Sequence, residues 1–422
     1  MITPAAFDEI YQELEAETKD IYRALGLLPI ADVDAPMTAA VCRLSWGRAG
    51  WSLEVLAEQG LLKPLHGHED LVRYRLLPAA RDHAKSLAVR TDPEQDRQAV
   101  LRRLCQWILA TSTHLRSRLT PAQATQQDLG TEATPICEAP FDDDAEALAW
   151  LESIETGFLD VLATASAAGW DDIVWQLVDA FGPLFLRRHP YDMSIAAHKM
   201  GLDAARRTSN KEAIQHMLMG GATGLSSAGQ LDTAIDWYRQ ALTSARRWQD
   251  AQAEGEALLG LASCDHQAGR PDEALLLLAE ATNVWRRCDY RRGIALATLV
   301  FGEIVLVDDP PRALSLFAWA RGLLLEAEAS YDAARALVLQ GHSRVVTGES
   351  GAGIHDLEMA LAGLSDVTST RWRARCLELL GAAWLGRGQR DEARSCFAAA
   401  TDLYAGVSRA DSERLRAVWS GL

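Results

Sequence analysis

One pattern of small and bulky residues recurs through the C-terminal half of the chain at steps of 39 or 40 residues. Five segments carry it: residues 228–242, 268–282, 307–321, 347–361 and 387–401. The pattern opens on a small residue: Ala234, Ala274, Ala313, Gly353 or Ala393. Seven residues later every copy has alanine: Ala241, Ala281, Ala320, Ala360 or Ala400. Between these two positions lies a bulky residue: Tyr238, Leu278, Phe317, Leu357 or Phe397. A fixed long period of this kind indicates one structural unit repeated along the chain.

The spacing within each segment predicts a helix. Two small residues seven apart lie on one helical face, two turns apart, where a neighbouring helix can approach closely. A turn signal precedes each segment, with glycine ending one helix and an acidic residue or proline opening the next. The preceding helix of each pair has a small position of its own: Ala222, Ala262, Gly302, Gly341 or Gly381. A weaker sixth copy has Ser194 and Gly201 in the small positions and Gly182 in the helix before. Each unit is therefore predicted to be a helical hairpin.

This pattern resembles the tetratricopeptide repeat, in the form with long helices and a period near forty. The resemblance implies an all-α fold in which hairpins stack into a right-handed α-solenoid whose first helices line a concave face. We expect about six hairpins, preceded by capping helices, over residues 141–422. By the same resemblance, the concave groove that binds a partner includes Glu256, His266, Glu303, Arg335, His342, Arg375 and Glu378. The alternative for each of these residues is an ordinary solvated position.

Residues 1–90 do not follow the repeat. Their patterns predict helices over 3–25, 35–44, 49–59 and 78–89 and strands over 61–65 and 71–77. Three helices followed by a β-hairpin are typical of a winged helix, so we expect a small winged-helix domain here. Residues 91–140 are expected to form a linker helix and a loop.

Four segments also resemble a specific family: IYRALGLLP at 21–29, VLAEQGLLKPL at 55–65, VRYRLLPAARDHAKSLA at 72–88 and EALAWLESIETGFLDVL at 146–162. They are similar to the C-terminal half of NB-ARC (STAND-class) regulators, which include antibiotic-regulatory activators of actinobacteria. Those proteins join a nucleotide switch, a winged helix and tetratricopeptide repeats. The resemblance implies a role in transcriptional or pathway regulation.

The chain departs from that family at its nucleotide switch. No Gly-x-x-x-x-Gly-Lys-Ser/Thr loop occurs in the sequence. The family has an apolar residue, histidine and aspartate after the strand that here ends Arg73-Tyr74-Arg75, and the residues present are Leu76, Leu77 and Pro78. Leucine has no side-chain donor and proline has no backbone N–H. We therefore expect no nucleotide and no other cofactor to be bound.

The charge balance disfavours nucleic acid as a partner. The 422 residues carry 42 basic and 58 acidic side chains, for a net charge of −16, whereas phosphate binding needs a concentrated basic face. The expected recognition helix has Arg48 beside Glu54 and Glu58. Arginine pairs also recur at the ends of second helices: 206–207, 246–247 and 286–287. We interpret them as complementing the helix dipole, with a phosphate-binding ridge as the alternative.

Two clusters of possible metal ligands have simpler explanations. His66, His68, Glu69 and Asp70 suit a polar hairpin tip better than a metal site. The run Asp142-Asp143-Asp144 precedes a helix, where acids stabilise the N-terminus, and no further oxygen ligands follow at the spacing of a calcium loop. No nucleophile elbow, Walker loop or His-Glu-x-x-His motif is present. We therefore predict no metal site, no catalytic residue and no enzyme activity.

Cysteine spacing and hydropathy predict a cytoplasmic protein. The seven cysteines include no close pair, since even Cys376 and Cys396 are far apart, so free thiols in a reducing compartment are expected. The acidic N-terminal segment lacks the apolar core of a signal peptide. The longest apolar run, 293–307, contains Glu303 and is too short to span a bilayer.

The interpretation that these patterns favour is a regulatory or adaptor protein that binds a protein or peptide partner in the solenoid groove. Two alternatives remain open: a sensor whose superhelix closes around a small molecule or peptide, and a regulator that binds DNA through the winged helix. Self-association is also compatible with the sequence.

Overall fold

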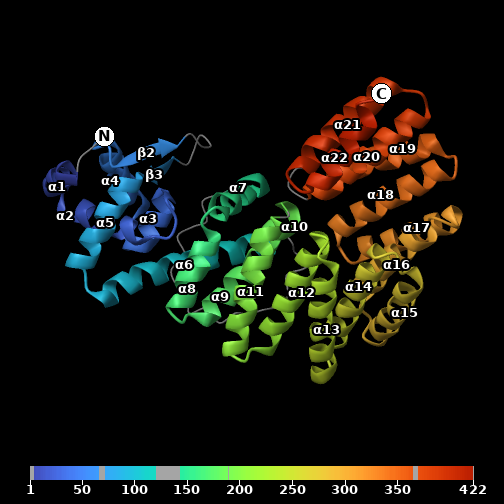
Figure 1. The fold of residues 1–422 in the computed structure, drawn as a ribbon, viewed down its shortest axis with the longest axis horizontal. Coiled ribbons are helices and arrows are strands. Elements are labelled where there is room, and N and C mark those ends of the chain that lie inside the picture. The colour runs from blue at the N-terminus through green and yellow to red at the C-terminus, as the bar shows by residue number, and fades with distance from the viewer. Residues whose placement is uncertain (1–3, 66–71, 120–142, 189, 365–368, 422) are drawn as a thin grey trace. The chain divides into compact units, whose positions relative to one another are not determined.

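The computed structural model describes residues 4–65, 72–119, 143–188, 190–364 and 369–421 (Figure 1). Helices dominate these residues, as predicted. Contacts divide the chain into two compact units: Met1–Phe181 with Asp203–Ser209, and Gly182–Leu202 with Asn210–Leu422. This division falls later than residue 141, where the array was expected to start, and the domain boundaries at 90 and 140 stay predictions.

The first unit begins with five helices and a small sheet. The helices are α1 (Pro4–Glu13), α2 (Ala16–Leu27), α3 (Ala35–Cys42), α4 (Trp46–Glu58) and α5 (Pro78–Thr91). The strands β1 (Asp32–Val33), β2 (Leu62–Leu65) and β3 (Arg73–Leu76) form an antiparallel sheet in the order β1-β3-β2. The Asp34 side chain caps α3 and the Ser45 side chain caps α4 by accepting backbone N–H bonds. The assignment of these elements to a winged helix stays a prediction.

Two features of this region differ from the sequence-based expectation. The single helix expected over 3–25 is wrong, because Glu15 is extended and separates α1 from α2. The break lets α1 pack on α5, where the Phe7 ring stacks on His83 at 5.6 Å. Strand β1 was not predicted, because two residues are too few to show an alternating pattern.

The rest of the first unit is helical: α6 (Glu94–Leu119), α7 (Asp144–Glu155), α8 (Phe158–Ala167) and α9 (Asp171–Ala180). Helix α6 contacts both α3 and α9 and so connects the two parts of the unit. The Asp143 carboxylate accepts the Glu146 backbone N–H at 2.8 Å, which confirms the expected cap at the start of α7. Asp142 and the predicted polar tip of His66, His68, Glu69 and Asp70 lie outside the described residues.

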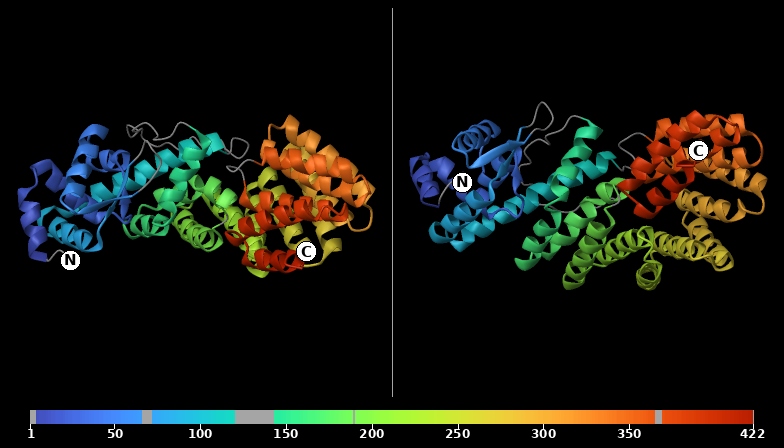
Figure 2. Two further views of the ribbon diagram at one scale, coloured as in Figure 1. Left: turned by 90° about the horizontal axis from the view of Figure 1, so that it is seen from above. Right: turned by 45° about the horizontal axis from the view of Figure 1, so that its top comes forward.

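The second unit is a succession of helical hairpins. The first helices of the five full hairpins are α12 (Lys211–Ser227), α14 (Ala251–Gln267), α16 (Arg291–Val305), α18 (Ser330–Val346) and α20 (Thr370–Gly386). Their second helices are α13 (Leu231–Trp248), α15 (Pro271–Arg287), α17 (Pro310–Glu326), α19 (Ser350–Gly363) and α21 (Arg390–Ala405). Helices α10 (Gly182–Arg188) and α11 (Tyr191–Arg207), of which the last turn groups with the first unit, precede them, and α22 (Arg409–Trp419) follows. The hairpins lie side by side in all three views (Figures 1 and 2).

Burial confirms the predicted contact between the two helices of each hairpin. All five alanines at the second small position are fully buried: Ala241, Ala281, Ala320, Ala360 and Ala400. A Cβ atom added to Gly302 would lie 2.4 Å from the Phe317 ring, and one added to Gly381 would lie 2.8 Å from the Phe397 ring. Phe317 and Phe397 on the second helices therefore occupy the space that Gly302 and Gly381 on the first helices leave free.

The turns repeat as regularly as the helices. Glycines with positive φ end first helices: Gly229, Gly269, Gly348 and Gly388. Residues other than glycine take the same left-handed conformation at the ends of second helices: Ser209, Gln249, Asp289 and Glu328. A left-handed residue reverses the chain sharply, so each helix can pack against the one before it.

The first helices lie on the inner side of the array. Each contacts the first helix of the next hairpin, from α12 to α14 and onward to α20, whereas the second helices of successive hairpins stay further apart. Closer spacing on one side of a stack curves it toward that side. The first helices therefore line the concave face, as expected for a tetratricopeptide-like solenoid. No helix within the described residues is long and apolar enough to cross a membrane.

Candidate partner-binding groove

The seven residues predicted for the groove all lie on first helices. Helix α14 carries Glu256 and His266, α16 carries Glu303, α18 carries Arg335 and His342, and α20 carries Arg375 and Glu378. Their helices line the concave face, but only some of the side chains lie together.

Glu303 is at the centre of one cluster. Its side chain is half-buried, and burial raises the pKa of its carboxyl group, while Arg335 and Arg375 act in the opposite direction. No described residue donates a hydrogen bond to this carboxylate. The two arginines come from the next two first helices, so the cluster joins three successive hairpins.

Arg335 is fixed by an acid and two aromatic rings. Its Nη1 donates to the Asp332 carboxylate at 3.1 Å, and its guanidinium lies 4.7 Å from the Trp372 ring centre and 5.8 Å from that of Tyr331. Asp332 is buried and also accepts from Arg292 at 2.8 and 3.0 Å. The Nε of Arg335 is buried and has no partner among the described residues. This arginine is held rigidly while part of its donor capacity is unused.

Glu378 also belongs to this cluster, through its bond with Arg375. It accepts hydrogen bonds from Arg414 at 2.9 Å, from the Tyr404 hydroxyl at 3.0 Å and from Arg375 at 3.3 Å. Burial by itself would raise the pKa of Glu378, but these donors hold it below its usual value. Burial, and secondarily Arg375, lowers the pKa of the neighbouring His342. The structure thus brings together five of the seven predicted residues.

Glu256 lies in a different cluster. Its carboxylate accepts from the Gln252 side chain at 3.2 Å. Burial raises the pKa of Glu256, opposed by Gln252, Arg292 and His216. His266 is half-buried in the last turn of α14, where burial lowers its pKa, and it has no hydrogen-bond partner in its side chain among the described residues. His266 therefore belongs to neither cluster.

Sequence reasoning missed several residues that build these clusters. Arg292 and Asp332 are forty residues apart, which is one repeat, so their contact had a signal in the period. The contact between Trp372 and Arg335 has no counterpart in the repeat pattern. Tyr404 and Arg414 come from α21 and α22, outside the first helices on which the prediction was based.

Charged side chains of both signs gather on and beside the first helices. Four arginines and four acids make up this set: Arg292, Arg335, Arg375, Arg414, Glu256, Asp332, Glu303 and Glu378. Such a set of side chains can pair with cations and anions, and it can bind both hydrogen-bond donors and acceptors. Within the described part of the chain, no three His, Cys, Asp or Glu side chains are arranged to hold a metal ion.

One arginine on each of the two surfaces considered for nucleic acid is paired with acids. Arg48 on α4 is paired with Glu17. On the second helices, Arg246 pairs with Glu254 and Glu280. Arginines already paired with carboxylates are poorly placed to neutralise phosphates.

Comparisons with known proteins agree with the repeat. Residues 213–287 match the family model of the tetratricopeptide repeat. Among solved structures, a Rap protein complexed with Competence and Sporulation Factor is 12% identical, with 81% of this chain and 90% of that chain covered and a TM-score of 0.49. A STAND protein with a tetratricopeptide repeat sensor from Pyrococcus horikoshii is 13% identical, with 99% and 68% covered and a TM-score of 0.41. No curated protein matches.

Proposed function

We propose that the protein is a non-enzymatic regulatory adaptor that binds a protein or peptide partner in the concave groove. The observation that carries this proposal is the half-buried Glu303 carboxylate, which faces Arg335 and Arg375 but accepts no hydrogen bond from a described residue. A buried charge without hydrogen bonds is costly. A donor from a bound partner would satisfy this carboxylate.

The regulatory part of the proposal rests on the resemblance to NB-ARC regulators. Leu77, at the position of the family's histidine, is half-buried between β3 and α5, and Pro78 opens α5. Neither side chain can bind a phosphate. We infer a descendant of such a regulator that acts through its repeats without a nucleotide. The free cysteines support a cytoplasmic location.

Calorimetry with ADP and ATP is expected to give no binding heat, and micromolar binding of either would contradict the inference that the protein acts without a nucleotide.

Affinity capture from the native host tests the groove. The bait is compared with a Glu303→Gln/Arg335→Ala variant and with Arg394→Ala, which changes an exposed arginine on α21. We expect partners that the wild type and Arg394→Ala retain and the groove variant loses. Recovery of the same proteins by all three baits would show that the groove is not the binding surface.

A further inference from the structure

The exposed face of α4 carries two tryptophans. Trp51 is 49% exposed and Trp46 is 37% exposed, although tryptophan side chains are highly buried on average. A Cβ atom added to Gly47, one turn before Trp51, would meet nothing within 4 Å, so the helix surface beside the rings is open as well. Exposed aromatic rings on an open helix face are typical of a surface that binds another protein.

The same face carries carboxylates that are not neutralised. Glu54 and Glu58 lie about one and two turns after Trp51, and both are exposed. No described residue donates a hydrogen bond to either carboxylate or forms an ion pair with it. The one basic residue of the helix, Arg48, is paired instead with Glu17, to which its Nε donates at 3.0 Å. The face therefore combines aromatic rings with two free negative charges.

This combination suits arginine side chains. A guanidinium binds over the face of an indole ring by a cation–π interaction, and it can donate two parallel hydrogen bonds to a carboxylate. Glu54 and Glu58 are four residues apart, which is about 6 Å along a helix, so their carboxylates can pair with nearby arginines of one chain. Both acids would repel the phosphates of a nucleic acid.

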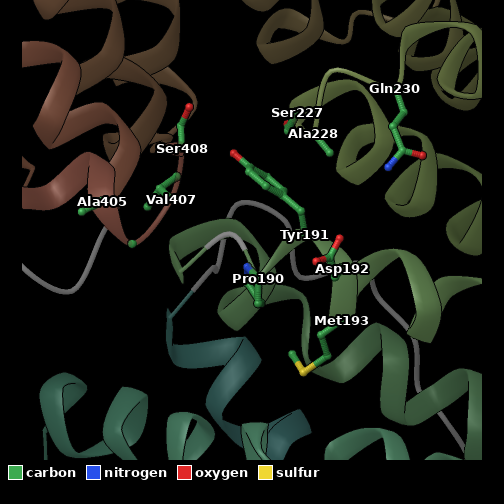
Figure 3. A pocket seen from close by; sticks show the side chains of 11 residues that line it. Pro190, Tyr191, Asp192, Met193, Ser227, Ala228, Gln230, Ala405, Val407 and Ser408 are labelled. Atoms are coloured by element: carbon green, nitrogen blue, oxygen red, sulfur yellow. The ribbon is translucent and has the colours of Figure 1, made fainter. Parts of the chain in front are cut away.

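An aromatic ring and an acid also lie together at a cavity of about 570 Å³ in the second unit. Tyr191 and Asp192 line this cavity at the start of α11 (Figure 3). There, however, the Tyr191 hydroxyl accepts from the Arg371 Nη1 at 2.9 Å. This guanidinium already lies beside the ring and would repel a second cation. The α4 face has no such competing charge, because Arg48 is paired with an acid.

We propose that the α4 face binds an arginine-rich segment of another protein. One arginine stacks on Trp51, and neighbouring arginines pair with Glu54 and Glu58. The α4 face belongs to the first unit and the groove to the second, so each unit has a binding surface of its own. This inference goes beyond the proposed function, and it holds whether or not the groove binds a partner.

Three short synthetic peptides test the chemistry of the partner by fluorescence anisotropy with the full chain. They have arginine, lysine or the uncharged isostere citrulline at the same positions, separated by serine. We expect the lysine peptide to bind about fivefold more weakly than the arginine peptide, because lysine cannot bind a carboxylate bidentately. Affinity should decrease with salt, which screens exposed charges. No binding of the arginine peptide, or equal binding of the citrulline peptide, would overturn the proposal.

Variants of the face test the site itself. Trp51→Ala and the double variant Glu54→Gln/Glu58→Gln are each expected to weaken binding of the arginine peptide about tenfold. All three side chains are exposed, so the variants should fold, and thermal unfolding checks this. Wild-type affinity in both folded variants would overturn the proposal.

Matched controls separate the site from general attraction to an acidic protein. Trp319→Ala removes a tryptophan that is 52% exposed on α17. Asp232→Asn/Asp236→Asn removes two exposed acids with the same spacing from α13, and Asp192→Asn removes the acid at the cavity. All three should bind the arginine peptide like the wild type. Weakening equal to that in the α4 variants would overturn the site.

Two further measurements separate this surface from its alternatives. The groove variant Glu303→Gln/Arg335→Ala should bind the arginine peptide like the wild type, and loss of binding in this variant alone would place the peptide in the groove. A DNA duplex should not bind at the same salt concentration. Binding of the duplex that Trp51→Ala abolishes would make nucleic acid the partner of α4 and overturn the proposal.

Discussion

At the scale of single residues, the fold depends on small side chains where two helices meet. Ala281 on α15 is fully buried, whereas Ala279 on the same helix is exposed. The two positions have the same residue type and the same helix, so they differ only in their surroundings. They provide a matched test of the predicted contact.

Ala281→Leu is expected to lower the free energy of unfolding by about 1–3 kcal/mol, because extra methylene groups overpack a tight helix contact. Ala279→Leu should have little effect, since its side chain faces solvent. Chemical denaturation of both variants measures the difference. Equal effects would contradict the register of the repeat.

The charged form of Glu303 is expected to lower the stability of the folded protein. Its pKa is raised in the folded protein, so its contribution to stability is full below the usual carboxyl pKa and is lost as the pH rises through the folded value. Glutamine resembles the neutral acid. Glu303→Gln should therefore be more stable than the wild type at pH 7, with the advantage shrinking on acidification. Denaturation curves at pH 7 and near the carboxyl pKa test this, and lower stability of the variant at pH 7 would contradict it.

At the scale of elements, the sequence predicted most of what the structure shows. Each hairpin had a local signal, such as the glycine that ends α14 and the alanines of α15. The break between α1 and α2 had none, because it depends on the packing of Phe7 against His83, far along the chain. The cluster around Glu303 could be predicted only in part. The repeat places Glu303, Arg335 and Arg375 on first helices, but it gives no signal for the contact of Trp372 with Arg335.

Substitutions in two of the turns are expected to change the free energy of unfolding in opposite directions. Gln249 has φ of 60°, which is strained for a residue with a side chain, whereas Gly269 has φ of 74° without that strain. Gln249→Gly is expected to raise the free energy of unfolding by up to about 1 kcal/mol after the entropy cost of glycine. Gly269→Ala should lower it by about 1 kcal/mol. Denaturation of the two variants checks the signs, and destabilisation by both would contradict the assigned turn conformation.

At the scale of the whole molecule, the sequence did not predict the contact between α10 and α20, in which Arg371 donates to Tyr191. A repeat specifies contacts between neighbouring hairpins, and its period contains no information on whether the ends of the array meet. Arg371 and Tyr191 do not occupy equivalent positions of the repeat. The curvature that accumulates over the hairpins brings them together. The contact between α10 and α20, with the bonds from Arg371 to Tyr191 and Ser227, is therefore known from the structure alone.

Hydroxyl-radical footprinting tests the central claim, that the concave face binds the partner. The protein is oxidised with and without the partner recovered by affinity capture, and modification is compared at Trp372 and His342 in the groove and at Trp319 and Met359, which are exposed on second helices. The account predicts protection of Trp372 and His342, with Trp319 and Met359 unchanged. Protection of Trp319 and Met359 alone would contradict it.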